Sequence, residues 1–206
     1  MEGLRYKLKK LDRSFYNRNV LTVAEEILGK ILVHKTPEGI VKGRIVEVEA
    51  YDGTMDKAAH AYPNLLTDRT RIQFGEGGYA YVYLIYGMYH CMNIVTGNVD
   101  EPQVLLLRAL EPIEGIALME KRRKTTKLKN LCSGPGKLCQ AMGITGEDYG
   151  KDLCGNEIYL EDAPALLAEN ILRSKRINID YAEEAKEFLW RYTIKNDPFV
   201  SCKIIQ

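Results

Sequence analysis

The sequence lacks the residues that define several protein classes. It contains five cysteines, an odd number with no CxxC pair, and only three histidines, His34, His60 and His90. None of these histidines lies beside two cysteines at zinc-ligand spacing, so neither a disulfide framework nor a metal site is expected. No apolar run approaches membrane-spanning length, and the first ten residues lack the apolar stretch of a secretory signal. We therefore expect an intracellular protein in a reducing compartment, with no membrane partner.

Phenylalanine and tryptophan are also scarce, with four and one residues, whereas tyrosine occurs 13 times. Tyrosine combines a flat apolar ring with a polar tip, which suits stacking and hydrogen bonding at one site, although half-buried sheets also use it. The net charge is only +1, so it does not by itself indicate nucleic-acid binding. One basic run stands out, however, with Lys121, Arg122, Arg123, Lys124, Lys127 and Lys129. Such a run is either a solvated face or, beside a DNA-facing site, a set of phosphate contacts.

The chain shows no repeat and no interdomain linker, which predicts a single domain over residues 1–206. Thr22 and Glu25 fit a capping box that opens a short helix over 23–28. Hydrophobic patterns predict further helices through Ile116 to Arg123 and from Ser133 to about Gly143. They predict strands over 31–34, 40–50, 79–85, 89–95, 104–110 and 188–194. Hairpin-type turns join neighbouring strands and few long helices intervene, which favours an α+β fold with a mostly antiparallel sheet and short flanking helices.

The segment from Gly43 to Tyr51 carries the first chemical signal. Alternation along a strand places Glu47, Glu49 and Tyr51 on one face, with the two carboxylates roughly 7 Å apart. The pattern fits a solvated acidic face equally well. A carboxylate that polarises water and stabilises a cationic sugar would, in contrast, serve the hydrolysis of a glycosidic bond.

A second signal is the tyrosine-rich segment from Gly78 to Tyr89. Tyr79, Tyr81 and Tyr83 alternate onto one face of the predicted strand, which is typical of a half-buried sheet. Tyr86 breaks this alternation directly before Gly87, so we expect it at a hairpin tip, beside Met88. Side chains on such a tip can enter a base step of DNA, and an enzyme that acts on a base must stack the extruded base between aromatic rings.

Four further positions are candidates with weaker signals. His60 follows the carboxylate strand, and Asn93 can face the same pocket as Tyr83. Arg108 lies inside an apolar strand, where a guanidinium must be paired with a carboxylate such as Glu49, a phosphate or water. The segment Ser133-Gly134-Pro-Gly-Lys137 offers free N–H groups and a lysine at a helix start, which fits a phosphate site or a simple helix cap equally well.

Five motifs together, in order and spacing, resemble the alkyladenine (3-methyladenine) DNA glycosylase family. They are RIVEVEAY (44–51), AAH (58–60), YVYLIYGMYHCMN (81–93), LLLRALEP (105–112) and SGPGKLCQAMGI (133–144). The resemblance implies a compact domain around a curved antiparallel sheet that acts as a monomer on double-stranded DNA containing a damaged purine. It implies hydrolysis of the N-glycosidic bond without strand cleavage, with no metal and no other cofactor.

The resemblance also assigns roles to residues. Glu49 matches the general base, and Arg108 the arginine that helps to hold the attacking water. Tyr51 and Tyr83 match the rings that enclose the flipped base, with His60 at its edge and the amide of Ala58 reading purine position 6. Asn93 matches the residue that disfavours the guanine 2-amino group. Tyr86, with Met88 beside it, matches the residue that fills the gap in the duplex, whereas Glu47 matches no catalytic residue.

The sequence departs from the family pattern at Thr70, Gln73 and Asn178, where the family favours Asn, Met and Gly. These departures leave the catalytic set unchanged but put substrate range in question. Two other functions remain as alternatives. One is a non-catalytic module that stacks single-stranded bases on its tyrosines. The other is a small-molecule nucleoside hydrolase that uses Glu47 and Glu49 as a pair. The cellular compartment would be the cytoplasm in a bacterium and the nucleus in a eukaryote.

Overall fold

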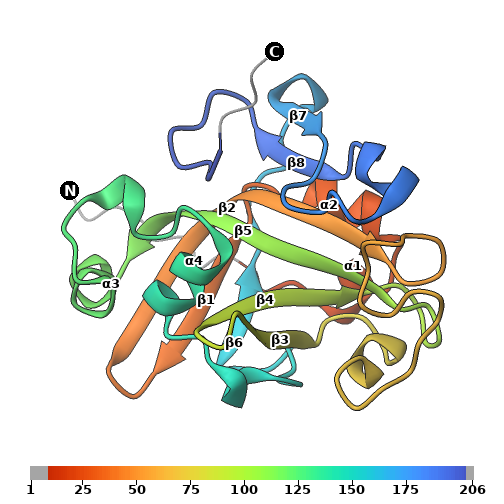
Figure 1. Cartoon of the computed structure of the whole chain (residues 1–206). Helices are drawn as coiled ribbons and strands as arrows, with labels where there is room; N and C mark the ends of the chain where they lie inside the picture. Colours follow the sequence, from red (N-terminus) through yellow and green to blue (C-terminus); the bar gives the residue numbers. More distant parts are fainter. Residues whose placement is uncertain (1–8, 203–206) are drawn as a thin grey trace.

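The computed structural model describes residues 9–202, and an antiparallel sheet organises them (Figure 1). Its eight strands are β1 (Ile31–Thr36), β2 (Gly39–Asp52), β3 (Ala80–Ile85), β4 (Tyr89–Thr96), β5 (Gln103–Glu114), β6 (Ile158–Glu161), β7 (Ile171–Ser174) and β8 (Arg191–Ile194). The strand order is β3-β4-β5-β2-β1-β6, with β8 pairing both β2 and β7. Each strand pair in this sheet is antiparallel, which confirms the predicted α+β class.

Short helices flank the sheet. They are α1 (Arg13–Tyr16), α2 (Val20–Glu26), α3 (Ile116–Arg123) and α4 (Pro135–Met142). Single 3₁₀ turns complete the connections: η1 (Arg71–Phe74), η2 (Leu128–Asn130), η3 (Gly146–Asp148), η4 (Ala168–Asn170) and η5 (Glu183–Glu187). Helix α2 packs on β2 and β5, and α4 packs on β4 and β5. None of the helices within residues 9–202 combines the length and apolarity needed to cross a membrane.

The main hydrophobic core includes residues of the two central strands of the sheet, β2 and β5. Strand β5 is apolar at nearly every position and is buried from Gln103 to Leu110, as expected for a strand covered on both faces. Strand β2 is longer and pairs with β1, β5 and β8 at different points along its length. The main core therefore joins side chains of these strands with those of α2 and α4.

Two local predictions were wrong at element ends. Helix α2 begins at Val20, because the side chain of Asn19 accepts a hydrogen bond from the Leu21 N–H and caps the helix three residues before Thr22. The predicted capping box of Thr22 and Glu25 does not form, since both residues lie inside the helix. The last strand begins at Arg191 and not at Phe188, whose ring instead packs against that of Trp190, with centroids 4.7 Å apart.

Gly115 is a backbone constraint at the junction of β5 and α3. Its φ of +74° lies in the left-handed region, and an added Cβ would lie against the Ile40 carbonyl oxygen and 2.8 Å from Val41 Cγ1. Gly87, at the β3–β4 turn, has a similar φ of +67°, but an added Cβ there would meet nothing within 4 Å. A side chain at Gly115 would therefore cause both backbone strain and steric overlap, whereas a side chain at Gly87 would cause backbone strain alone.

We predict that Gly115→Ala lowers the free energy of unfolding by about 3 kcal/mol, because strain and overpacking act together. The matched variant Gly87→Ala should lose only about 1 kcal/mol, from the left-handed backbone alone. Urea denaturation of both variants measures the difference. Equal losses would show that the β5–α3 junction relaxes freely around the added methyl group.

Candidate active site

A cavity of about 400 Å³ lies against one face of β3, β4, β5 and β2, which are neighbours in the sheet. The register explains how four strands contribute to it. Tyr81 on β3 is opposite Asn93 on β4, Asn93 is opposite Leu106 on β5, and Leu106 is opposite Glu49 on β2. Side chains opposite one another in a sheet share a face, so this row forms one wall of the cavity. The sequence-predicted residues in its lining are Glu49, Tyr51, Ala58, His60, Tyr83, Tyr86, Asn93 and Arg108.

The carboxylate of Glu49 is fully buried and is fixed by two hydrogen-bond donors and one ion pair. The Tyr51 hydroxyl donates to Oε2 at 2.8 Å, and the Ile177 N–H donates to Oε1 at 2.8 Å. Nη1 of Arg108 lies 3.4 Å from Oε1. Glu49 therefore meets the cavity in a fixed orientation, beside a positive charge.

Glu47 has the same burial but a different environment. It accepts hydrogen bonds from Arg108 Nε at 2.9 Å, Arg191 Nε at 2.8 Å, and the N–H and hydroxyl of Ser201 at 2.6 and 2.9 Å. Burial alone would raise the pKa of Glu47, but the two guanidiniums and the hydrogen bonds from Arg191 and Ser201 lower it below its ordinary value. Glu47 does not line the cavity. The two carboxylates, equivalent by alternation, thus differ: Glu47 is surrounded by donors outside the cavity lining, whereas Glu49 belongs to that lining.

Two guanidinium groups cover the aromatic rings of the cavity. The Arg176 guanidinium lies 4.6 Å from the centre of the Tyr51 ring, and that of Arg69 lies 4.7 Å from the centre of the Tyr83 ring. Neither arginine belongs to the cavity lining, so both rings are supported without the cavity being filled. Arg176 is held in turn by a fully buried ion pair with Asp56. Burial raises the pKa of both tyrosines, so their hydroxyls stay protonated.

His60 closes one side of the cavity through a small polar network. Its Nδ1 lies 2.8 Å from the Tyr81 hydroxyl, and its Nε2 accepts from Arg69 at 3.3 Å. Arg69 also donates to the Tyr81 hydroxyl at 3.1 Å. Burial, together with the nearby charge of Arg69, lowers the pKa of His60 to about 4. The imidazole is therefore neutral at physiological pH.

Ala58 and Asn93 both use an amide N–H in a hydrogen bond within the protein. The Ala58 N–H donates to Asp56 Oδ1 at 2.9 Å, and Ala58 lines the cavity; its reading of the base stays a prediction. Asn93 is buried and its Nδ2 donates to the Tyr81 carbonyl at 3.2 Å. Asn93 also belongs to the cavity lining.

The hairpin tip lies at the cavity mouth, as the sequence predicted. Tyr86 is 77% exposed with a φ of +53°, and Met88 is 69% exposed. Tyr86 belongs to the lining of this cavity, whereas Met88 belongs to the lining of a second cavity. Two large apolar side chains therefore project into solvent from a tight turn.

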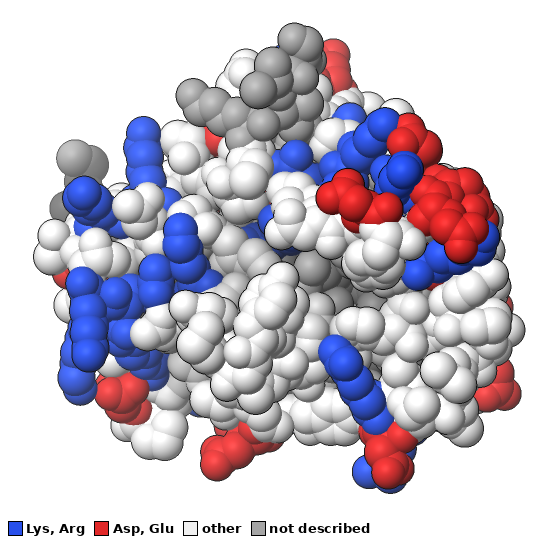
Figure 2. Space-filling model, viewed as in Figure 1, with Lys and Arg blue, Asp and Glu red and all other residues white. Residues whose placement is uncertain are grey.

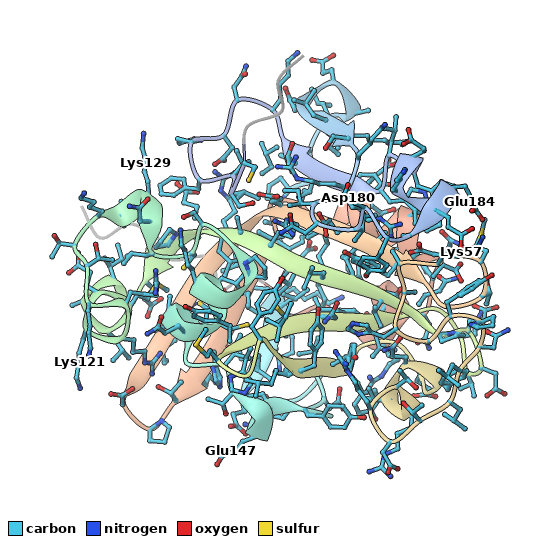
Figure 3. The ribbon with its side chains drawn as sticks, in the orientation of Figure 1. Lys57, Lys121, Lys129, Glu147, Asp180 and Glu184 are labelled. Atoms are coloured by element: carbon cyan, nitrogen blue, oxygen red, sulfur yellow. The ribbon has the colours of Figure 1, made fainter. Side chains whose placement is uncertain are left out.

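Several Lys and Arg side chains lie close together on the protein surface (Figure 2). Figure 2 shows Lys and Arg collected over α3, and Figure 3 shows Lys121 and Lys129 pointing away from the body of the protein. Lys121 and Arg122 pair with Glu38, whereas Lys124, Lys127 and Lys129 are exposed. At the start of α4, Gly134 is the N-cap without a side-chain cap bond, so Ser133 does not act as a helix cap. Lys137 is exposed, and Pro135 and Gly136 reach the cavity rim.

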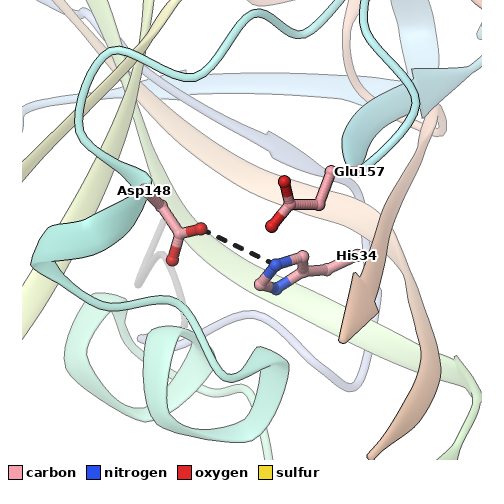
Figure 4. A group of neighbouring side chains, drawn as sticks. All are labelled: His34, Asp148 and Glu157. Carbon is pink, nitrogen blue, oxygen red and sulfur yellow. Dashed lines mark ion pairs between the residues drawn. The ribbon is translucent and has the colours of Figure 1, made fainter. Parts of the chain in front are cut away.

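The second cavity contains a group of three potential metal ligands, His34, Asp148 and Glu157, whose ligand atoms lie within 4.8 Å of one another (Figure 4). Lys151 pairs with both carboxylates, at 2.8 Å from Asp148. The Nδ1 of His34 already bonds the Met142 carbonyl at 2.9 Å. The Lys151 ammonium thus already pairs with the two carboxylates that a metal ion would bind. The group is an ion-pair network outside the cavity lined by Tyr51 and Tyr83, which we call the aromatic cavity.

Sequence reasoning missed several residues that complete the site. Arg69, Arg176 and Arg191 hold Tyr83, Tyr51 and Glu47, and the Ile177 N–H binds Glu49. These residues come from irregular segments or from a distant strand, so no periodicity marks them. Tyr81 was found only as a member of an alternating face, although its hydroxyl joins His60 to Arg69.

Comparison with known proteins shows to which family this chain is similar. Residues 14–198 match the family model described as methylpurine-DNA glycosylase. A protein of Alkaliphilus oremlandii is 52% identical over 202 residues, covering 94% of this chain and all of the relative. Proteins of Clostridium novyi and Bacillus cytotoxicus are 50% and 49% identical over 95% and 91% of this chain, and cover 100% and 97% of the relatives. All three carry the name "Putative 3-methyladenine DNA glycosylase".

These matches confirm the resemblance drawn from the five motifs, and with it the expectation of a monofunctional DNA glycosylase. The aromatic cavity with its buried carboxylate lies within the matched residues. The chain belongs to the methylpurine-DNA glycosylase family.

Proposed function

We propose that this protein flips damaged purines out of double-stranded DNA into the aromatic cavity and hydrolyses their N-glycosidic bond, with Glu49 as the general base. The observation that carries the proposal is the difference between the two carboxylates. Glu49 lines the cavity beside Arg108, whereas Glu47 is surrounded by donors outside the cavity lining. The cavity volume of about 400 Å³ lies in the range of small-molecule sites, roughly 300–1,000 Å³.

The bond changes follow from this arrangement. Water bound at Glu49 gives its proton to the carboxylate as its oxygen attacks C1′ of the sugar. The C1′–N bond breaks, its electron pair leaves with the base, and an abasic site remains. The negative charge of Glu49 also stabilises the positive charge that develops on the sugar. Arg108 orients this carboxylate, because its Nη1 lies 3.4 Å from Oε1.

The cavity suits a flat and partly cationic base. Tyr51 and Tyr83 offer two ring faces, each held from behind by a guanidinium, so neither ring needs to reorganise when a base enters. Alkylated purines such as 3-methyladenine and 7-methylguanine carry positive charge, and their glycosidic bond breaks readily. We include the neutral lesions hypoxanthine and ethenoadenine, which need protonation as they leave.

Binding to duplex DNA would use the exposed face around the cavity. Tyr86, with Met88 beside it, would fill the space that the flipped nucleotide leaves. Ser133, Gly134 and Lys137 at the start of α4 would contact backbone phosphates, joined by Lys124, Lys127 and Lys129. We propose that the chain acts as a monomer in a single glycosylase domain. The named relatives are bacterial, which favours the cytoplasm over the nucleus.

The two alternatives fit the geometry less well. A nucleoside hydrolase using Glu47 and Glu49 as a pair would need both carboxylates at the substrate, but Glu47 does not line the cavity. A single-stranded binding module would have no use for a buried, oriented carboxylate, which is costly to desolvate.

We expect Glu49→Gln to reduce base release from a duplex containing 3-methyladenine by at least about a thousandfold, since the amide cannot accept the proton of water. Affinity for damaged duplex should survive, because the aromatic rings remain. Single-turnover base release and a binding titration measure the two effects. The exposed carboxylate of Glu147 provides the control (Figure 3), and Glu147→Gln should behave as the wild type. Near-normal release by Glu49→Gln would refute the general-base assignment.

Removal of the hairpin-tip ring tests the duplex interaction. Tyr86→Ala should bind lesion-containing duplex about tenfold more weakly, because stacking of one aromatic ring on a base is worth roughly 1–3 kcal/mol. The release rate at saturating protein should change less than the affinity. Leu167→Ala, at an exposed apolar position of similar accessibility, is the control. Unchanged lesion affinity in Tyr86→Ala would argue against a gap-filling role.

The protonation state of His60 can be measured directly. Its lowered pKa, about 4, predicts that the imidazole stays neutral at pH 5.5, where an ordinary histidine with a pKa of 6.5 is mostly charged. Because the unfolded chain binds this proton more readily, the contribution of His60 makes the folded state less stable as pH falls from 6.5 to 4. Titration of the three histidines by NMR assigns the value. Arg69→Gln should raise it, and a His60 pKa near 6.5 in the wild type would contradict the described network.

A further inference from the structure

The side chain of Gln73 is buried in the cavity wall without a partner. Gln73 is 1% exposed, and within the described residues neither its Nε2 nor its Oε1 makes a hydrogen bond of normal geometry, although the amide lies close enough to the Tyr81 hydroxyl to act on its pKa in the lowering direction. Other buried side-chain atoms without partners belong to Tyr16, Thr96 and Arg176, and none of these residues lines the aromatic cavity. A buried amide that pairs with nothing is unfavourable for folding, so it needs an explanation.

The backbone around Gln73 is fixed, so the side chain does not simply lie in a loose loop. Gln73 lies in η1, where its N–H donates to the Thr70 carbonyl at 2.8 Å. The Thr70 hydroxyl in turn donates to the Leu65 carbonyl at 2.7 Å. This turn packs against β4 and β5, the two strands that carry Asn93 and Leu106. The amide is therefore held at the cavity by a rigid support.

A second buried glutamine, Gln103, provides a comparison, because both ends of its amide make hydrogen bonds within the protein. The Oε1 of Gln103 accepts from the Val20 N–H at 2.8 Å, and its Nε2 donates to Asp52 Oδ2 at 3.1 Å. Both ends of Gln103 are thus used to join α2 to β2. Gln73 has the same chemistry and similar burial, but its donor and acceptor remain for something that enters the cavity.

We propose that Gln73 reads the edge of the flipped base and favours a purine that presents a donor beside an acceptor. This inference rests on the proposed function and names a specificity-determining residue for it. An amide can make two parallel hydrogen bonds to such an edge, as glutamine does with adenine in DNA. Hypoxanthine offers O6 as acceptor and N1–H as donor.

Ethenoadenine provides the contrasting edge. Its additional ring joins N1 to N6, so this edge carries no N–H for Oε1 of Gln73. A site built to hydrogen-bond its substrate discriminates against an analogue that leaves its buried polar groups unpaired. Gln73 therefore selects hypoxanthine over ethenoadenine, while the stacking rings accept both.

The test compares Gln73→Met with Gln103→Met. Methionine has nearly the length and volume of glutamine but lacks its amide. Single-turnover release from duplexes carrying hypoxanthine or ethenoadenine is measured for the wild type and both variants, together with thermal unfolding. Gln73→Met should lower hypoxanthine release about tenfold and change ethenoadenine release less than threefold. Its Tm should equal or exceed that of the wild type, because no partner loses a bond.

The control should behave in the opposite way. Gln103→Met should lower Tm, since Val20 and Asp52 lose their partner, and should leave the ratio of the two release rates unchanged. Equal changes of both rates in Gln73→Met, or no change in either, would overturn the inference, as would a clear loss of its thermal stability. A wild-type protein that releases neither base would instead overturn the proposed lesion range, and with it the role of Gln73.

Discussion

The ion pairing of Arg108 with two carboxylates is the interaction on which the site depends. Glu47 and Glu49 are both fully buried on one strand face, and two such charges cannot remain ionised together without compensation. Arg108 contacts both, and Arg191 adds a second positive charge at Glu47. The geometry separates the two carboxylates: Glu47 anchors the arginine outside the cavity lining, and the arginine in turn lies beside Glu49 within that lining. The buried Glu49 carboxylate is thus held beside an arginine that a second buried carboxylate orients.

The sequence predicted those parts of the fold and site that depend on local pattern. Alternation placed Glu47, Glu49 and Tyr51 on one face, and the turn residues located the hairpin tip with Tyr86. Pattern could not separate Glu47 from Glu49, because their difference arises from Arg191 and Ser201, more than 140 residues further along the chain. The family resemblance, and not periodicity, selected Glu49. The buried Asp56 accepts a hydrogen bond from the Ala58 amide, a contact that spacing does not reveal.

The aromatic rings of the cavity are contacted by arginines from other segments of the sequence. The loop that contains Asp56 and the segment that contains Arg176 are joined by a buried ion pair, and Arg176 covers the Tyr51 ring. Tyr83 receives similar cover from Arg69, which lies close to η1 and Gln73. The sheet supplies the carboxylates and the Tyr51 and Tyr83 rings, whereas irregular segments supply the guanidinium groups of Arg69 and Arg176 that lie over these rings.

The contact between Ser201 and Glu47 also has a consequence for the order of events during synthesis. Arg108 and Ser201 are 93 residues apart in the chain, yet both bind the same carboxylate. While a ribosome is still translating the second half of the chain, Glu47 lacks two of its donors, and Arg191 is also missing. A nascent chain can form the central hairpins but cannot yet balance the charges beneath the cavity. The charge balance beneath the cavity is therefore reached only after the residues around 201 have emerged from the ribosome and joined the fold.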